Sequence, residues 1–144
     1  MDDVVEVDAP AEVVWSVLTD FDRYGEWNPF ISRCRADLTV GAPIDMTVQQ
    51  LAPRPIRMRE WIRGVTPGRE FTYSMKPIPL GALRSKRTHT LISSAGDRTR
   101  YESRFELDGW LAPLVGLLFG RGFQRGFPAM TTAVAREAER LHSH

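Results

Sequence analysis

Hydrophobic and polar residues alternate along most of the chain before Gly109, with the period of two residues that half-buried β-strands show. This alternation predicts strands at 33–38, 44–49, 56–63 and 71–76, and a final hairpin of 84–93 and 99–108. The short β-branched segment Val4–Val7 predicts one more strand at the start. Short turns rich in glycine and proline separate most of these segments, so we expect an antiparallel meander of seven strands.

Two parts of the chain have helical spacing instead. A helix is expected to start within 8–12, where its apolar stripe consists of Val13, Val14, Val17 and Leu18. A short second helix or turn should end at the Asn28–Pro29 break. Apolar residues recur at three- and four-residue intervals over 111–141, which predicts a long C-terminal helix. Because glycine and proline disfavour helix interiors, we expect this helix to be kinked or split between Gly120 and Pro128.

Composition limits the kind of protein. With 144 residues and 42% hydrophobic residues the chain suits one domain, 1–144. Its formal net charge of +1 predicts no binding of nucleic acid. The single cysteine, Cys34, allows no internal disulfide and fits a reducing cytoplasm. The N-terminus lacks a basic signal-peptide region, and the apolar run 111–119 is too short for membrane insertion, so we expect a cytoplasmic protein.

Several motifs agree with one family. The segments 8–15 (DAPAEVVW), 18–24 (LTDFDRY) and 26–31 (EWNPFI) follow the first strand, and Gly41, 65–69 (VTPGR), 96–100 (GDRTR) and Gly109 punctuate the later elements. In these features the chain resembles the START/polyketide-cyclase-like (SRPBCC) superfamily, and within it the bacterial polyketide cyclase/dehydrase and lipid transport branch. The resemblance implies an α+β helix-grip fold. In that fold a seven-stranded curved antiparallel sheet surrounds a long C-terminal helix, with two short helices after the first strand.

A sheet curved around a helix leaves a space that side chains do not fill, and such spaces hold mostly apolar ligands. Alternation and helical spacing place one set of side chains toward this space, with Leu117 also closing it from the helix. We expect ligand contacts from Met46, Met58, Glu60, Phe71, Tyr73, Met75, Tyr101, Ser103, Phe105, Phe123, Phe127 and Met130. For each of them ordinary core packing is the alternative, since methionines and aromatic residues fill cores equally well.

Two polar residues are weak catalytic candidates. Glu60 shares a face with Met58 and Ile62, where it could orient a ligand hydroxyl or act as a general base. The alternative is a register shift that leaves Glu60 in water and turns Trp61 inward. His89 could act as an acid or base near neutral pH, but no carboxylate partner is evident, and a satisfied or exposed strand histidine is the alternative.

Two surfaces have open interpretations. Arg57, Arg59 and Arg63 on one strand and Arg84, Lys86 and Arg87 on another fit either an outward solvated charge lattice or a basic patch for an acidic carrier domain or lipid head groups. The apolar, glycine-rich stretch 111–127 fits a gate over the cavity, a dimer contact or a buried helix face.

These observations favour a protein that binds or transports an apolar, lipid- or polyketide-like small molecule. No phosphate-binding loop, dinucleotide motif, zinc motif or nucleophile elbow occurs, so we expect no cofactor and no metal. One alternative is a cofactor-independent polyketide cyclase, aromatase or dehydratase that uses Glu60, His89, Tyr73 or Tyr101. Another is a protein-partner module that makes its contact through 111–119, and a homodimer stays open.

Overall fold

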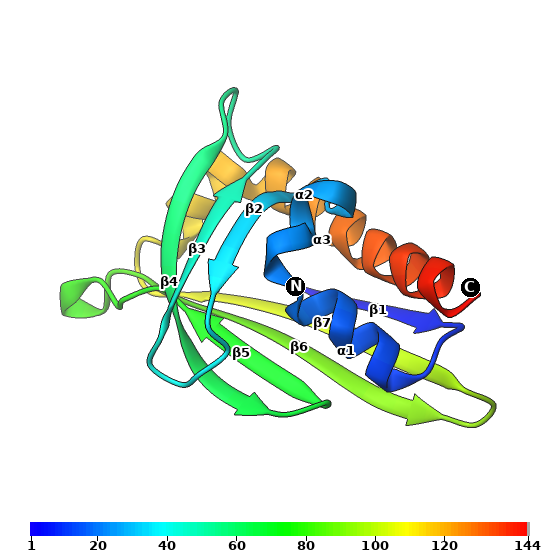
Figure 1. The fold of residues 1–144 in the computed structure, drawn as a ribbon. Coiled ribbons are helices and arrows are strands. Elements are labelled where there is room, and N and C mark those ends of the chain that lie inside the picture. Colours follow the sequence, from blue (N-terminus) through cyan, green and yellow to red (C-terminus); the bar gives the residue numbers. More distant parts are fainter. Residues whose placement is uncertain (144) are drawn as a thin grey trace.

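The computed structural model describes residues 1–143, which form one seven-stranded sheet and the helices packed against it (Figure 1). The strands are β1 (Asp2–Val7), β2 (Ile31–Ala36), β3 (Pro43–Val48), β4 (Ile56–Thr66), β5 (Glu70–Ser74), β6 (Arg84–Ser94) and β7 (Arg98–Asp108). Their order is β1-β7-β6-β5-β4-β3-β2, and every neighbouring pair is antiparallel. Strands β2 to β7 therefore form a meander of six strands, and the expected meander of seven is wrong for β1, which pairs with β7 and not with β2.

The helices are α1 (Ala11–Thr19), η1 (Phe21–Arg23), α2 (Tyr24–Trp27), the short η2 (Pro79–Gly81) between β5 and β6, and α3 (Ala112–His142). The helices other than η2, which lies in a projecting loop, are on one side of this sheet (Figure 1). Figure 1 shows the sheet bending so that β2, β3 and β4 stand at a steep angle to β6 and β7, with α3 crossing behind them. The predicted helix-grip fold is confirmed.

The C-terminal helix has the predicted length and is more continuous than its glycine and proline content indicates. α3 runs over 31 residues as one helix with Pro128 inside it, so of the two outcomes expected between Gly120 and Pro128, a kink or a split, the split is wrong. Tertiary packing compensates the poor helix propensity here, because Gly122, Gly126 and Phe127 are buried against the rest of the protein. Within residues 1–143, no helix combines the length and the apolar character that crossing a membrane requires.

The inner face of the sheet is covered in two different ways. Over one half, α1 and the C-terminal part of α3 pack closely and form a solid core; Trp15 and Phe21 meet Phe71 edge-on, with ring centroids 5.8 and 6.0 Å apart. Here α3 presents the small buried residues Ala135 and Ala138, which allow a close approach. Over the other half, the N-terminal part of α3 presents large side chains and stands off from the sheet.

The start of α3 is fixed by a turn after β7. Gly109 has φ +114°, and a Cβ at this position would collide with the carbonyl oxygen of Ala82, so glycine is required. The backbone N–H of Leu111 donates to that same oxygen at 2.8 Å, and the indole Nε1 of Trp110 donates to the carbonyl of Leu80 at 3.1 Å. These bonds tie the β5–β6 connection to the first turn of α3.

Candidate ligand-binding site

A cavity of about 300 Å³ lies between the N-terminal part of α3 and the inner face of the sheet. This volume is at the small end of the range for small-molecule sites, and the lining is almost entirely apolar, as in such sites. The residues that line it are Phe30, Ile31, Met46, Val48, Leu51, Ile56, Met58, Glu60, Tyr73, Met75, Leu83, Ser85, Arg87, Phe105, Leu107, Val115, Phe119, Phe123 and Phe127.

The structure brings most of the expected ligand contacts together at this cavity. Those that line it are Met46, Met58, Glu60, Tyr73, Met75, Phe105, Phe123 and Phe127. The others, Phe71, Tyr101, Ser103 and Met130, are buried on the same side of the sheet but lie in the solid core beyond the cavity. Leu117, expected to close the cavity from α3, is instead 82% exposed. The expected contacts did not include Leu51 from the β3–β4 connection, Leu83 from the β5–β6 connection, Val115 and Phe119 from the first two turns of α3, Phe30 just before β2, or Ile31, Ile56, Ser85 and Arg87 from the strands.

Glu60 points into the cavity. It is 8% exposed and lines the cavity, whereas the neighbouring Trp61 is half-buried and does not line it, so the register shift considered above does not occur. Burial raises the pKa of the Glu60 carboxyl from 4.5 to about 7, and the positive charge of Arg87 opposes this rise. A carboxyl whose pKa lies near neutrality suits a group that exchanges a proton.

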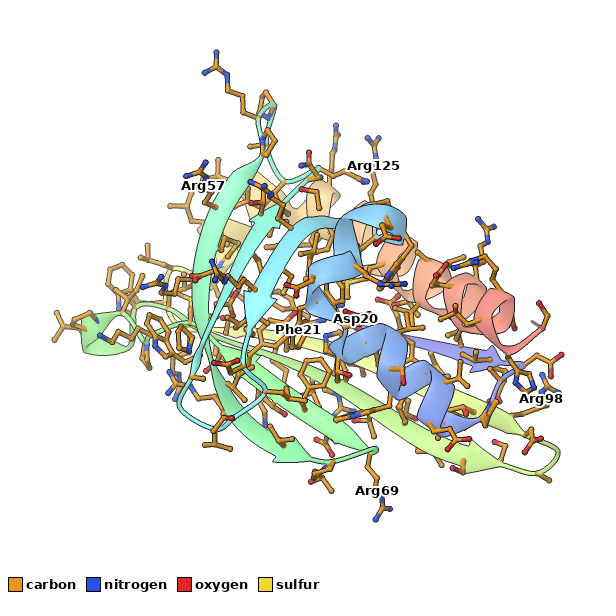
Figure 2. All side chains as sticks on the ribbon, viewed as in Figure 1. Asp20, Phe21, Arg57, Arg69, Arg98 and Arg125 are labelled. Carbon is orange, nitrogen blue, oxygen red and sulfur yellow. The ribbon has the colours of Figure 1, made fainter. Side chains whose placement is uncertain are left out.

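Arg87 is the other charged group of the cavity, and its position corrects the expected outward face. Alternation along β6 places Arg87 with His89 and Leu91, and all three are buried. Only 3% of Arg87 is exposed, while Arg57 and Arg125 point away from the body of the protein (Figure 2). The same two-residue period that placed Glu60 inward could have identified Arg87.

The guanidinium of Arg87 is held by three groups. Its Nη2 donates to Ser103 Oγ at 2.9 Å and lies 3.7 Å from the sulfur of Met130. Its central carbon lies 4.2 Å from the centroid of the Phe127 ring, a cation–π contact. Its Nε is buried and has no hydrogen-bond partner within residues 1–143. One end of the cavity therefore holds a guanidinium cation that has more N–H donors than the surrounding side chains have acceptors.

His89 lies behind the cavity wall. Its Nδ1 is 2.6 Å from the hydroxyl of Tyr101, and its ring packs beside Phe71 with a centroid distance of 4.8 Å. Burial and the charge of Arg87 keep the pKa of His89 well below its ordinary value of 6.5, so the ring is neutral at physiological pH. Among the described residues it forms part of the solid core and does not reach the cavity lining.

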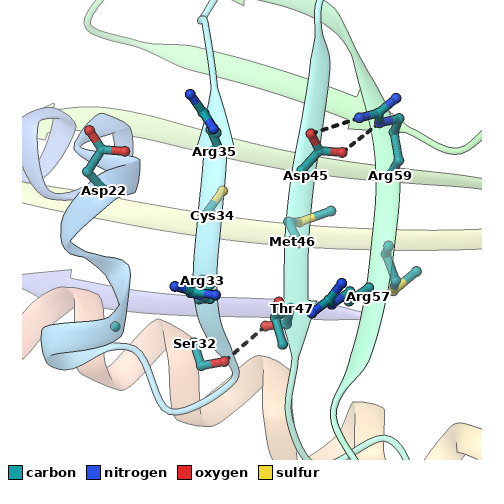
Figure 3. A pocket seen from close by; sticks show the side chains of 12 residues that line it. Asp22, Ser32, Arg33, Cys34, Arg35, Asp45, Met46, Thr47, Arg57 and Arg59 are labelled. Atoms are coloured by element: carbon teal, nitrogen blue, oxygen red, sulfur yellow. Dashed lines mark hydrogen bonds and ion pairs between the residues drawn. The ribbon is translucent and has the colours of Figure 1, made fainter.

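A second, polar hollow of about 920 Å³ opens on the outer face of β2, β3 and β4 (Figure 3). Figure 3 shows Arg35 on β2 level with Asp45 on β3 and Arg59 on β4, and Arg33 level with Thr47 and Arg57. Arg59 forms an ion pair with Asp45, with Nε and Oδ1 2.6 Å apart, and this hydrogen bond holds the pKa of Asp45 below its usual range. This hollow is open to solvent, and ion pairs between exposed side chains contribute little to stability. The outward arginines therefore form, at least in part, the solvated lattice predicted above.

The start of α3 is an exposed apolar surface. Leu114, Leu117 and Leu118 are 51%, 82% and 64% exposed, and Trp110 beside them is 65% exposed. The opposite side of the same turns carries Val115 and Phe119, which line the cavity. Interpretation of this stretch as a buried helix face is wrong for the leucines, and their exposure is compatible with a gate or a partner contact.

The arrangement suits binding, with limited acid–base chemistry. Glu60 is the one carboxyl among the cavity residues. Within residues 1–143, no group of three His, Cys, Asp or Glu side chains is placed to hold a metal ion.

A curled antiparallel sheet closed by a long C-terminal helix, with an apolar cavity between them, defines the helix-grip fold. The chain belongs to the family described as polyketide cyclase / dehydrase and lipid transport, whose model matches residues 1–140.

Solved structures with this fold include proteins of several kinds. The ZhuI aromatase/cyclase from Streptomyces sp. R1128 aligns with a TM-score of 0.76 at 20% identity, over 97% of this chain and 93% of that one. A START superfamily protein from Mycobacterium smegmatis aligns with a TM-score of 0.72 at 17% identity, over 98% and 97%. Norcoclaurine synthase from Thalictrum flavum aligns with a TM-score of 0.71 at 17% identity, over 100% and 93%. No curated protein matches the chain in sequence. At these identities the likeness establishes the fold alone.

Proposed function

We propose that the protein binds an apolar small molecule, of lipid- or polyketide-like character, in the cavity between the sheet and α3. The observation that carries this proposal is the cavity itself. It is lined by aromatic, aliphatic and methionine side chains, and its polar groups, Glu60, Ser85, Arg87 and Tyr73, are few. The description of the family, which includes lipid transport, agrees with this function.

The first test is whether neutral apolar compounds stabilise the purified protein. We expect 1-decanol or 2-naphthol to raise the unfolding temperature, because a ligand that binds only the folded state stabilises it. Native mass spectrometry of the protein as purified should also detect a bound apolar compound. If neither measurement finds a ligand, the proposed function is wrong.

A blocked cavity provides a sharper test. Val115 lies on the first turn of α3 and lines the cavity, so we expect Val115→Trp to fill the space and weaken 1-decanol binding by about tenfold or more. Leu117→Trp is the matched control, because Leu117 lies on the same helix but points to solvent. Binding that survives Val115→Trp, or falls equally in both variants, would place the ligand elsewhere.

Catalysis of a cyclisation or dehydration without a cofactor is a second candidate function. It is favoured by Glu60, whose raised pKa near 7 suits proton transfer at a ligand enclosed in the cavity. Two proteins with this fold are an aromatase/cyclase and norcoclaurine synthase.

For this function we expect Glu60→Gln to slow turnover of a poly-β-ketone thioester by about tenfold or more. Glu106→Gln, which changes an exposed carboxyl on β7, should leave the rate unchanged. Equal rates in the parent and the Glu60 variant would remove Glu60 from any catalytic role. The rates of both variants are measured by mass spectrometry of the products.

A further inference from the structure

The cavity contains a positively charged side chain, Arg87, that forms no ion pair within residues 1–143. A guanidinium has five N–H donors, and the hydrogen bonds that Arg87 donates within residues 1–143 come from its Nη2, to Ser103 and the weak acceptor Met130, with the neutral hydroxyl of Tyr101 also close enough to interact. Its Nε is buried without a partner. None of the ion pairs among these residues includes Arg87. A buried charge without a counterion is costly, so such a group points to an anion that is supplied from outside the chain.

Two carboxyls are close enough to interact with Arg87 at longer range, and neither replaces such an anion. Asp3 on β1 is partly buried, but it does not line the cavity, and its Oδ2 has no hydrogen-bond partner of its own. Glu60 lines the cavity, yet it forms no ion pair with Arg87, and burial raises the pKa of its carboxyl to about 7, which disfavours its charged form. The inner end of the cavity is therefore electropositive.

The rest of the cavity is apolar and leads outward. Arg87 and Glu60 are almost fully buried, whereas Leu51, Ile56, Val115 and Phe119 are only partly buried and form the outer end. A ligand that fits this gradient has an anionic head and an apolar body.

We propose that the ligand is an amphipathic monocarboxylic acid, a single-chain fatty acid or an aromatic carboxylic acid, whose carboxylate binds the guanidinium of Arg87 while its apolar part extends toward Val115 and Phe119. This inference rests on the proposed function. A planar carboxylate matches the fork of N–H donors on a guanidinium better than a hydroxyl does. A cavity of about 300 Å³ also favours one chain or a small ring system over a lipid with two chains.

The test compares ligands that share a chain and differ in the head group. Isothermal titration of the full chain with decanoic acid, 1-decanol and decyl phosphate is measured at the same pH. We expect decanoate to bind about tenfold more tightly than 1-decanol, since a charge-assisted bond replaces a neutral one. Arg87→Met should remove this preference and leave 1-decanol binding within about threefold of the parent, while Arg87→Lys should keep part of it. Arg84→Met, on the same strand but exposed, is the control and should keep the full preference.

Each result decides the inference. If 1-decanol binds and decanoate binds no better, the carboxylate assignment is wrong while the proposed function survives. If decyl phosphate binds about tenfold more tightly than decanoate, the head group is a phosphate and the assignment is also wrong. If no compound binds, both proposals fail. Should Arg87→Met not fold, the preference of the parent and its reduction in Arg87→Lys still give the answer.

The pH dependence of binding supplies a readout that a purely structural arginine would not produce. A bound carboxylate repels ionised Glu60, so the preference for decanoate should weaken from pH 6 to pH 8 in the parent and stay constant in Glu60→Gln. Other groups around Glu60 do not titrate in this range. Burial raises the pKa of Tyr73 on β5 far above neutrality and that of Cys34 on β2 to about 12, while His89 on β6 stays neutral. The guanidinium is a permanent cation, and the α3 residues at the cavity are uncharged.

Discussion

Replacement of Glu60 by glutamine should make the protein more stable at pH 8 than the parent, by about 3 kcal/mol, and this gain should vanish toward pH 4. The sign follows from the direction of the pKa shift. Burial raises the pKa of Glu60 in the folded state from 4.5 to about 7, so the folded protein holds this proton more tightly than the unfolded chain does. The stabilisation is complete below pH 4.5 and is lost as the pH rises through 7. Glutamine, which is neutral at every pH, does not lose it.

The measurement is urea unfolding of both proteins at several pH values, with the difference in unfolding free energy taken at each. His89 contributes with the opposite sign, because its lowered pKa destabilises the folded state as the pH falls below 6.5. This contribution is common to both proteins and cancels in the difference. Glu106→Gln, with an exposed side chain, should follow the parent curve. A constant difference between parent and Glu60→Gln from pH 4 to pH 8 would show that Glu60 is not buried in a cavity wall.

Alternation along the strands predicted the sheet and much of the inner face. It placed Glu60 on the inner face and Trp61 on the opposite face, because a strand has only two faces and Met58 and Ile62 fix which one is apolar. Alternation also places Arg87 on the same inner face as His89 and Leu91. Arg87 was nevertheless expected on the outer face, because a run of basic residues suggests exposure. A buried arginine becomes evident from sequence when the period is given more weight than the charge.

Helical spacing predicted the existence of α3 but not which of its sides faces the sheet. Val115, Leu118 and Phe119 satisfy the same three- and four-residue intervals as Leu114 and Leu117, so the pattern does not say which apolar side of α3 faces the sheet. The structure turns Val115 and Phe119 inward and leaves the leucines exposed. An apolar stripe identifies a buried face only when the opposite side is polar, and the first turns of α3 have no polar side.

The boundary between the solid core and the cavity could not be predicted from the sequence either. Phe71, Tyr101 and Phe105 lie on the same side of the sheet, yet only Phe105 lines the cavity. The difference depends on how far α3 stands from the sheet, which is set by Ala135 and Ala138 at one end and by large phenylalanines at the other. Such a distance between elements far apart in sequence has no local signal.

The division between solid core and cavity predicts that Phe71 matters more for stability and Phe123 more for ligand binding. Phe71 is fully buried among Trp15, Phe21 and His89, so Phe71→Ala should lower the free energy of unfolding by roughly 3–5 kcal/mol, the range for deletion of a buried aromatic ring. Phe123 stacks on Phe127 at the cavity wall and is only partly buried, so Phe123→Ala should cost roughly half as much.

Binding should respond in the reverse order. Phe123→Ala enlarges the cavity, so the variant should bind 1-dodecanol more tightly relative to 1-decanol than the parent does, because the longer chain fills the space that the ring vacated. Phe71→Ala removes a ring that never reaches the ligand and should leave this ratio unchanged. Urea unfolding and titration of the same two variants measure both effects. A change in chain-length preference with Phe71→Ala, or equal stability losses in the two variants, would mean that the inner face is one continuous core, and the ligand would then have no separate space between the sheet and α3.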